Sequence, residues 1–359
     1  MTKKIKVAII GTGGIAHVHS KVYHKIPEVE MVGLCDIVPG KAQKFAKEEG
    51  WDKAKTYQDH EKLLHDLEVD AVSVCTPHAF HAEVSINCLE AGVNVLCEKP
   101  MSVTLEQAVK MARAAKDSGK ILTIGFQPRY DPNIQLMNEI VQSGRLGKIY
   151  YVETCKSRRR FIPGGTFISE EEAAIGAIGD IGCYGLDMVL KALEYPEPLT
   201  VSAEVTDYFG KSEKYSGGDW DPEEFQVEDF GVGFVRLAGD ITLCTKTSWA
   251  MHLDSLGHTF YLGTEAALKC KNGSPDLTLY HDLENLQVHT PIPKKNHNII
   301  PFDEKIKDFI RAVKENDEAP IPGSEIIFNQ AIIDGMIKSA ERGKRSRNKS
   351  SANLEGSQL

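Results

Sequence analysis

Short apolar runs alternate with helix-periodic segments over the first 125 residues of the chain. The apolar runs have strand length, and the segments between them repeat apolar residues at helical spacing. Strands are predicted at 7–10, 31–35, 71–75, 93–97 and 121–124, and helices at 18–26, 41–49, 57–67, 79–91 and 105–118. Strands separated by helices form parallel sheets through right-handed crossovers. The pattern predicts an α/β fold that begins with a doubly wound parallel sheet.

After about residue 130 the alternation gives way to consecutive strands. A strand is predicted at 150–155 and a long helix at 173–193, then strands at 199–205, 230–237, 241–249, 259–262 and 267–270, and helices at 303–316 and 324–342. Consecutive strands form a mostly antiparallel sheet. We expect an open sheet, covered in part by the long helix and otherwise by a second subunit. This predicts a homodimer or homotetramer through the C-terminal sheet.

The change of pattern predicts the domain organisation. Residues 1–126 are expected to form the parallel-sheet domain, and 127–343 an α+β domain with the open, mostly antiparallel sheet. The segment 344–359 is basic, polar and Ser-rich, and is expected to be disordered. The segment 208–227 has little periodicity and is expected to be a long loop, either a lid over the substrate or a plain surface excursion.

A glycine-rich turn joins the first predicted strand to the first predicted helix. The run GTGGIA at 11–16 has the spacing Gly-x-Gly-x-x-Ala. Gly11 permits a tight turn, Gly13 lets the backbone approach a pyrophosphate, and Ala16 permits close packing of helix on strand. Amide groups at the start of the helix then face the phosphates. The motif predicts a dinucleotide-binding Rossmann domain.

An acidic residue closes the second predicted strand. Asp36 follows the glycine turn by about 20 residues, where a carboxylate accepts hydrogen bonds from the adenosine ribose. The alternative is a structural turn with a surface aspartate. The carboxylate repels a 2′-phosphate, and no arginine follows directly to receive one. We therefore expect NAD rather than NADP, with Ile37 beside the adenine.

Composition and charge restrict the function classes. The chain has 359 residues, 42% of them apolar, and a net charge of −9. This charge argues against binding to nucleic acid or anionic membranes, and no apolar stretch is long enough to span a bilayer. The chain enters its first predicted strand at once, so we expect no signal peptide and a cytoplasmic location.

Cysteines and histidines lack the spacing of a metal site. The eight cysteines contain no Cys-x-x-Cys pair, and three of them close predicted strands: Cys35, Cys75 and Cys97. We interpret them as reduced core residues rather than catalytic thiols. The closely spaced histidine pairs, at 17 and 19 and at 78 and 81, have no neighbouring thiols or carboxylates, so no metal site is predicted.

The predicted strand 93–97 leads into Glu98-Lys99-Pro100. The carboxyl ends of parallel strands are where open α/β sheets bind their ligands. A lysine there can hold a substrate oxygen and stabilise the negative charge that develops on it. The alternative for Lys99 is an ordinary surface lysine after a strand.

A second polar group lies along the predicted helix 173–193. Asp180, Tyr184 and Asp187 fall at i, i+4 and i+7, on one helix face. A tyrosine beside a lysine has a stabilised phenolate and can exchange a proton with an alcohol, and Asp180 can accept a hydrogen bond from a substrate hydroxyl. The alternative is a core tyrosine and a helix-start aspartate.

Several motifs, in this order along the chain, resemble the Gfo/Idh/MocA oxidoreductases. They are the glycine turn with His19, Thr76-Pro77 followed by His81, Glu98-Lys99-Pro100, the run 125–130, Asp180-x-Gly182-x-Tyr184 and the run 263–266. The resemblance implies a Rossmann domain and a C-terminal α/β domain whose open sheet forms dimers or tetramers. It also implies a nicotinamide cofactor and sugar, polyol or related substrates.

The resemblance implies roles for single residues. Lys99 matches the lysine that polarises the reacting oxygen, and Asp180 the helix aspartate that positions the substrate. Tyr184 stands at the proton-transfer position, where inositol-dehydrogenase-like members have histidine. In this the chain is similar to the branch of glucose–fructose oxidoreductase and dihydrodiol dehydrogenase. The expected cofactor-binding residues are Gly11, Thr12, Gly13, Gly14, Ile15, Asp36, Ile37, Thr76, Pro77, His78, His81, Glu98, Lys99 and Gln127.

These observations predict an NAD(H)-dependent oxidoreductase that transfers a hydride between nicotinamide and a CH–OH group of a carbohydrate-like substrate. The arginines at 158–160 either contact an acidic or phosphorylated substrate or form a solvated charge run, and we expect the charge run. Two other functions stay open. One is a redox-neutral enzyme with retained NAD, such as a glycosidase or epimerase; the other is a non-catalytic cofactor-sensing regulator, against which the presence of Lys99, Asp180 and Tyr184 together argues.

Overall fold

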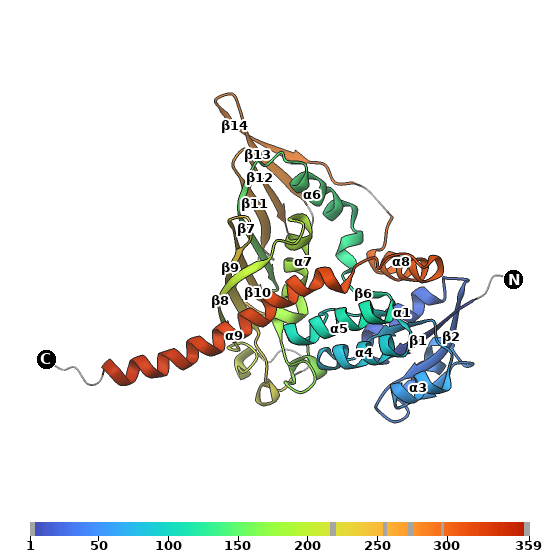
Figure 1. Cartoon of the computed structure of the whole chain (residues 1–359). Helices are drawn as coiled ribbons and strands as arrows, with labels where there is room; N and C mark the ends of the chain where they lie inside the picture. Colours follow the sequence, from blue (N-terminus) through green and yellow to red (C-terminus); the bar gives the residue numbers. More distant parts are fainter. Residues whose placement is uncertain (1–3, 216–219, 254–256, 272–275, 296–297, 355–359) are drawn as a thin grey trace. The chain divides into compact units, whose positions relative to one another are not determined.

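The computed structural model describes residues 4–215, 220–253, 257–271, 276–295 and 298–354 (Figure 1). The chain divides into two compact units. The first combines Met1–Pro132, Glu171–Ala174 and Asn296–Gln330, and the second combines Asn133–Glu170, Ile175–Lys295 and Ala331–Leu359.

The first unit is built on a six-stranded sheet with the order β3-β2-β1-β4-β5-β6. All of its strand pairs are parallel, which confirms the predicted doubly wound sheet. The strands are β1 (Ile5–Ile10), β2 (Val29–Cys35), β3 (Lys55–Tyr57), β4 (Ala71–Val74), β5 (Asn94–Cys97) and β6 (Leu122–Ile124). The helices are α1 (Gly14–Tyr23), α2 (Lys41–Glu49), α3 (His60–Asp66), α4 (His81–Glu90), α5 (Leu105–Ser118) and α8 (Pro301–Glu315). The short strand β3 was not predicted, because its end falls within the helical pattern at 57–67.

Local signals set the ends of these helices. At the start of α5, the Thr104 hydroxyl accepts a hydrogen bond from the Gln107 amide at 3.2 Å and the Gln107 side chain reaches back, a capping box. Gly119 ends the helix in the left-handed conformation, with φ 65°. The strand order reverses beside β1, which pairs with β2 on one edge and β4 on the other. Ligands of open α/β sheets bind at this switch point.

Helix α8 belongs to the first unit, which differs from the predicted boundary at 126. Its residues Ile306, Phe309 and Ile310 are buried in the same apolar core as strand β1. The amphipathic pattern at 303–316 correctly predicts a helix with one apolar face. It does not say which core that face joins, because that choice depends on packing between distant segments.

The second unit contains an eight-stranded sheet with the order β14-β13-β12-β11-β7-β10-β9-β8. Its strands are β7 (Ile149–Ser157), β8 (Pro198–Thr206), β9 (Phe230–Leu237), β10 (Ile241–Ser248), β11 (His258–Gly263), β12 (Ala266–Lys271), β13 (Leu277–Leu283) and β14 (Leu286–Ile292). Strands β7 and β10 are parallel and the other described pairs are antiparallel, which confirms the mostly antiparallel sheet. The hairpin of β13 and β14 was not predicted.

The long helix expected at 173–193 is shorter and begins later. A π-helical turn, Ile178–Gly182, leads into α7 (Cys183–Ala192). The residues before it are held in another conformation, because the buried Glu228 carboxylate accepts hydrogen bonds from the amides of Gly176 at 2.8 Å and Ile178 at 3.0 Å. A Cβ on Gly176 would lie 2.0 Å from the Glu228 carbonyl oxygen, so glycine is required there.

Helices α6 (Pro132–Gln142) and α9 (Gly323–Leu354) complete the chain. Helix α6 was not predicted. Helix α9 continues past residue 342, the predicted end, into the segment 344–359 that was expected to be disordered. Disorder of that tail stays a prediction, and residues 355–359 lie outside the described residues. Within the described ranges, no helix is long and apolar enough to cross a membrane.

Candidate functional site

The glycine turn lies between the carboxyl end of β1 and the first turn of α1. Gly11 has φ +87°, and a Cβ there would lie 2.6 Å from the Cys75 backbone, so the turn tolerates no side chain at this position. At Gly13 and Gly14 an added Cβ meets nothing within 4 Å, and no side chain caps the start of α1. The turn therefore leaves open space in front of helix amides, which fits a pyrophosphate.

Asp36 fixes this turn from the end of β2. Its Oδ2 accepts hydrogen bonds from the amide and the hydroxyl of Thr12 at 2.9 and 2.8 Å, and its Oδ1 from the amide of Val38 at 3.0 Å. Lys41 Nζ lies 3.0 Å from Oδ2. Burial alone would raise the pKa of Asp36, but the Thr12 and Val38 hydrogen bonds and Lys41 outweigh it and lower the pKa. The carboxylate is therefore ionised, as ribose binding requires. The hydrogen bonds between Asp36 and Thr12 were not predicted from the sequence.

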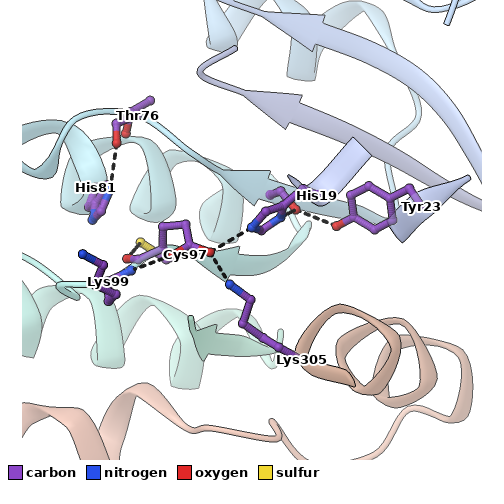
Figure 2. A network of polar contacts seen from close by, with 9 residues as sticks. His19, Tyr23, Thr76, His81, Cys97, Lys99 and Lys305 are labelled. Atoms are coloured by element: carbon purple, nitrogen blue, oxygen red, sulfur yellow. Dashed lines mark hydrogen bonds and ion pairs between the residues drawn. The ribbon is translucent and has the colours of Figure 1, made fainter. Parts of the chain in front are cut away.

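His81 connects the loops that follow β4 and β5. Its Nδ1 lies 2.6 Å from the carbonyl oxygen of Pro100, and its Nε2 lies 2.9 Å from that of Thr76 (Figure 2). Burial lowers the pKa of His81, so the neutral ring donates to one of these carbonyls at a time. Both ring nitrogens of His81 thus face backbone carbonyl oxygens. The buried Oγ1 of Thr76 has no hydrogen-bond partner among the described residues.

Glu98 is buried directly after β5, in a polar network whose members His19, Lys99 and Lys305 are labelled in Figure 2. Its Oε1 accepts hydrogen bonds from His19 Nε2 at 2.8 Å and from Lys305 Nζ, and its Oε2 accepts one from the Lys99 amide at 3.4 Å. Burial alone would raise the pKa of Glu98, but Lys305 and His19 hold it well below its usual range. A Cβ on Gly125 would lie 2.9 Å from Oε2, so glycine leaves room for the carboxylate. Glu98 is thus an ionised, fully paired group directly before Lys99.

The network continues away from Glu98 through the other nitrogen of His19. His19 Nδ1 lies 2.9 Å from Ser73 Oγ, which lies 2.5 Å from the Tyr23 hydroxyl. Burial lowers the pKa of His19 and raises that of Tyr23. These side chains join α1 to β4, so Glu98 is connected through His19 to both elements.

Lys305 is the participant in this network that sequence reasoning missed. It is only 2% exposed and comes from α8, far along the chain from Glu98. The signal was present: Lys305 falls at helical spacing from Phe302 and Phe309, on the apolar face of α8. A lysine at such a position indicates a buried countercharge, because an unpaired buried ammonium is costly.

In the second unit, Asp180 lies in the π-helical turn and Tyr184 in the first turn of α7. Cβ atoms on Gly182 and Gly185 would lie 2.7 Å from Thr247 Oγ1 and 2.9 Å from Thr154 Oγ1. These glycines let the segment pack closely on strands β10 and β7. The buried Asp180 carboxylate accepts a hydrogen bond from Trp249 Nε1 at 2.8 Å. The third residue of the predicted stripe, Asp187, is also buried.

Of the arginines at 158–160, Arg159 and Arg160 are exposed and Arg158 is half-buried, and two of the three guanidinium groups contact neighbouring rings. Arg158 Nη1 lies 3.9 Å from Asp180 Oδ2, and its guanidinium lies over the Phe161 ring. The Arg160 guanidinium lies 5.0 and 5.1 Å from the ring centres of Phe209 and Tyr215. Arg159 is exposed. Arg158 is therefore a candidate for substrate contact.

The eight cysteines lie among the described residues as thiols rather than disulfides, and seven of them are buried. Burial raises the pKa of the Cys97 thiol to about 12 and that of Cys35 to about 12. Thiols so far from ionisation are poor nucleophiles. No group of side chains suited to a metal ion occurs in the part of the chain that the structure describes.

Comparison with known proteins places these features in a family. The family model described as "Oxidoreductase family, NAD-binding Rossmann fold" matches residues 5–126, and that described as "GFO/IDH/MocA C-terminal domain" matches 134–269. D-glucoside 3-dehydrogenase of Escherichia coli (strain K12) is 35% identical over 268 residues, which cover 73% of this chain and 76% of the relative. Glucose-6-phosphate 3-dehydrogenase of Bacillus subtilis (strain 168) is 24% identical over 344 residues, 92% of this chain and 94% of the relative.

Among solved structures, levoglucosan dehydrogenase in complex with NADH and levoglucosan has the same fold. It superposes with a TM-score of 0.80 at 19% identity, covering 95% of this chain and 98% of that one. The chain matches both family models and a well-covered relative above 30% identity. It therefore belongs to the Gfo/Idh/MocA family of oxidoreductases, with an NAD-binding Rossmann fold and sugar dehydrogenases among its relatives.

Proposed function

We propose that this protein is an NAD(H)-dependent dehydrogenase that oxidises a secondary ring hydroxyl of a glucose-type sugar to a ketone. The observation that carries the proposal is the glycine turn, open in front of α1 and held by the ionised Asp36. The class of substrate is supported by the E. coli relative and the B. subtilis relative, whose names both specify a 3-dehydrogenase of a glucose derivative. By this reasoning the hydroxyl oxidised is the one at position 3.

When bound, NAD supplies the group that accepts the hydride. Amides of Gly13 and Gly14 would hold its pyrophosphate, and Asp36 its adenosine ribose. Thr76 Oγ1 offers a hydrogen bond at the nicotinamide end. The remaining contacts are proposed at Gly11, Thr12, Ile15, Ile37, Pro77, His78, Lys99 and Gln127. The side chains of Glu98 and His81 are hydrogen-bonded within the protein, so these two residues are proposed to act by shaping this site.

Each catalytic residue has one proposed task. Lys99 places a positive charge against the reacting oxygen, which favours loss of the hydroxyl proton. Tyr184 accepts that proton while the carbon bonded to the oxygen loses a hydride, so the alcohol becomes a ketone. Tyrosine has a reference pKa of about 10, so a nearby ammonium is needed to stabilise the phenolate. Asp180 accepts a hydrogen bond from a sugar hydroxyl and sets the orientation of the ring.

NAD is the proposed cofactor in preference to NADP. The Asp36 carboxylate would repel a 2′-phosphate, and its bonds to Thr12 and Val38 keep it in place. Lys41, beside Asp36, is already paired with it and does not replace the arginine typical of NADP sites. We also propose a homodimer or homotetramer that assembles through the C-terminal sheet. A cytoplasmic location stays a prediction.

The test is absorbance at about 340 nm, where reduced nicotinamide absorbs. Purified protein is incubated with NAD or NADP and with methyl glucosides, glucose 6-phosphate, levoglucosan or myo-inositol. We expect NADH to form with a glucoside and NAD, and a 3-keto sugar as the product. Sugar conversion without free NADH would favour an enzyme that retains its cofactor. Binding of NAD without any sugar conversion would favour a sensor, and either result would overturn the proposal.

A further inference from the structure

Trp249 and Arg158 follow the carboxyl ends of two adjacent central strands in the sheet of the second unit. They directly follow β10 and β7, the parallel pair of this sheet, and the Arg158 amide donates to the Ser248 carbonyl at 2.8 Å. The carboxyl ends of adjacent parallel strands bring the residues after them together. Both residues here reach one atom, Asp180 Oδ2: the indole Nε1 lies 2.8 Å away and Arg158 Nη1 3.9 Å away.

The Trp249 indole is the closer and more buried of the two donors. Its side chain is fully buried, with an exposed fraction of 0%, whereas the Arg158 side chain is about a third exposed. A buried N–H that donates to a carboxylate forms a charge-assisted hydrogen bond, shorter and stronger than a neutral one. The indole has a single donor and no acceptor, so this bond fixes one carboxylate oxygen in one direction.

Backbone hydrogen bonds and an aromatic contact hold Trp249 in place. The Trp249 amide donates to the Asp229 carbonyl at 2.9 Å, and the Trp249 carbonyl accepts from the Phe161 amide at 3.1 Å. The ring meets Phe225 edge to face, with centroids 6.3 Å apart. Phe225 belongs to the segment 208–227, of which the structure describes 208–215 and 220–227, and Phe209 and Trp220 from these parts pack against the same apolar cluster. These three aromatic residues thus belong to the cluster that surrounds Trp249.

We infer that Trp249 is a positioning residue for Asp180: its indole N–H fixes the carboxylate that binds the sugar hydroxyl, and Phe225 of the loop 208–227 holds the indole in place. The inference rests on the proposed function, because it takes Asp180 as the group that orients the sugar. It assigns the loop a specific task, support of the substrate-binding carboxylate. Substitutions that weaken the packing of Phe225 on Trp249 should then reduce sugar recognition, although Phe225 itself is not proposed to contact the sugar.

The test compares Trp249→Phe with Trp51→Phe. Phenylalanine keeps an apolar ring in the cluster but removes the N–H. Trp51 is a matched control, because its indole also donates a hydrogen bond, at 2.7 Å to Ser20, in the first unit. For Trp249→Phe we expect kcat/KM for the glucoside to fall by about ten- to a hundredfold, the range for one hydrogen bond to a charged group. The affinity for NADH should match that of Trp51→Phe.

A double-mutant cycle with Asp180→Ala, which removes the acceptor, separates positioning from general packing. If Trp249 acts through the Asp180 carboxylate, Trp249→Phe should cost little more once Asp180→Ala is present, so the two effects are not additive. Additive losses, or an unchanged kcat/KM in Trp249→Phe with an active wild type, would overturn the inference alone. A wild-type protein that oxidises none of the sugars would overturn the proposed function, and this inference with it.

Discussion

At the scale of single residues, the candidate site is made of charged groups whose state is set by buried neighbours. Asp36 and Glu98 both stay ionised although burial opposes ionisation, because each accepts several hydrogen bonds and faces a lysine. Glu228 and Asp229 behave differently: both accept hydrogen bonds from backbone amides, but burial outweighs those bonds and raises the pKa of each carboxyl. Residue identity supplies the chemistry, and the surroundings decide the charge.

Lys99 is the residue on which the proposed mechanism depends most. Lys99→Ala removes the positive charge against the reacting oxygen, so turnover should fall by at least about a hundredfold while the fold survives. The control is Lys116→Ala, on the exposed side of α5, which should leave turnover unchanged. The measurement is the initial rate of NADH formation together with the melting temperature. Near-normal turnover in Lys99→Ala would remove Lys99 from the mechanism.

At the scale of secondary-structure elements, α8 stabilises the site through one side chain. Lys305→Met would leave the buried Glu98 carboxylate without its ammonium partner, and breaking such a pair costs about 3–5 kcal/mol. We expect a loss of that size in the free energy of unfolding, measured by denaturant titration. Lys314 lies on the same helix as Lys305 and forms an exposed ion pair with Glu28. Lys314→Met should therefore cost less than about 1 kcal/mol.

The double variant Glu98→Gln with Lys305→Met tells whether the loss comes from the unpaired charge. It removes both charges at once and should regain most of the stability lost in Lys305→Met alone. If the double variant were as unstable as the single one, packing of the Lys305 chain, and not its charge, would stabilise the first unit.

The segment before β9 carries two adjacent buried carboxyls with the opposite behaviour. Burial, the largest cause, raises the pKa of Glu228 to about 7 and that of Asp229 to about 6. A carboxyl whose pKa is raised on folding binds a proton more tightly in the folded state. Its contribution to stability is complete below the unfolded pKa, about 4.5 for Glu228, and is lost as the pH rises through 7.

We therefore expect the free energy of unfolding of the wild type to fall more steeply between pH 5 and about 7.5 than that of Glu228→Gln. Asp229, whose pKa is raised to about 6, is common to both proteins, so the difference between the two curves isolates Glu228. Denaturant titrations across this pH range give the curves, with Glu170→Gln, at an exposed position, as the control. Parallel curves for wild type and Glu228→Gln would show that Glu228 is ionised throughout.

At the scale of the whole molecule, the C-terminal sheet offers an apolar surface for assembly. Along β9, Gly231 and Gly233 are buried under Ile178 and Met336, while the alternate residues Val232 and Phe234 are 41% and 44% exposed. A strand alternates its side chains between the two faces, so one face is covered by helices and the other carries exposed apolar groups. Such surfaces mark interfaces more often than they stay in water.

The expected outcome is a homodimer or homotetramer in solution. Phe234→Glu places a charge on this face and should lower the molar mass measured by light scattering, because burying an unpaired carboxylate is costly. Val109→Glu replaces a similarly exposed apolar residue on α5 of the first unit and should leave the mass unchanged. A monomeric wild type would contradict the prediction.

The sequence by itself determined the features that repeat or cluster locally. The parallel sheet follows from alternating strand and helix patterns, and the glycine turn with Asp36 follows from a spacing of residues near in the chain. Lys99, Asp180 and Tyr184 were found in the same way, by their place at a strand end or on a helix face. Their roles stay predictions, because the sequence gives their positions and not the contacts around them.

Tertiary structure alone decided which distant residues meet. Lys305 joins Glu98 across 207 positions and Trp249 joins Asp180 across 69. Only the tertiary structure shows that α8 packs in the core of the first unit and that β13 and β14 form a hairpin. It also shows that the start of the expected helix at 173–193 is not helical, because its backbone binds Glu228 instead. The physical reason is common to these cases. Periodicity predicts the conformation of a single element. The partner of a buried charge or of an apolar face lies on another element, and which element that is depends on packing.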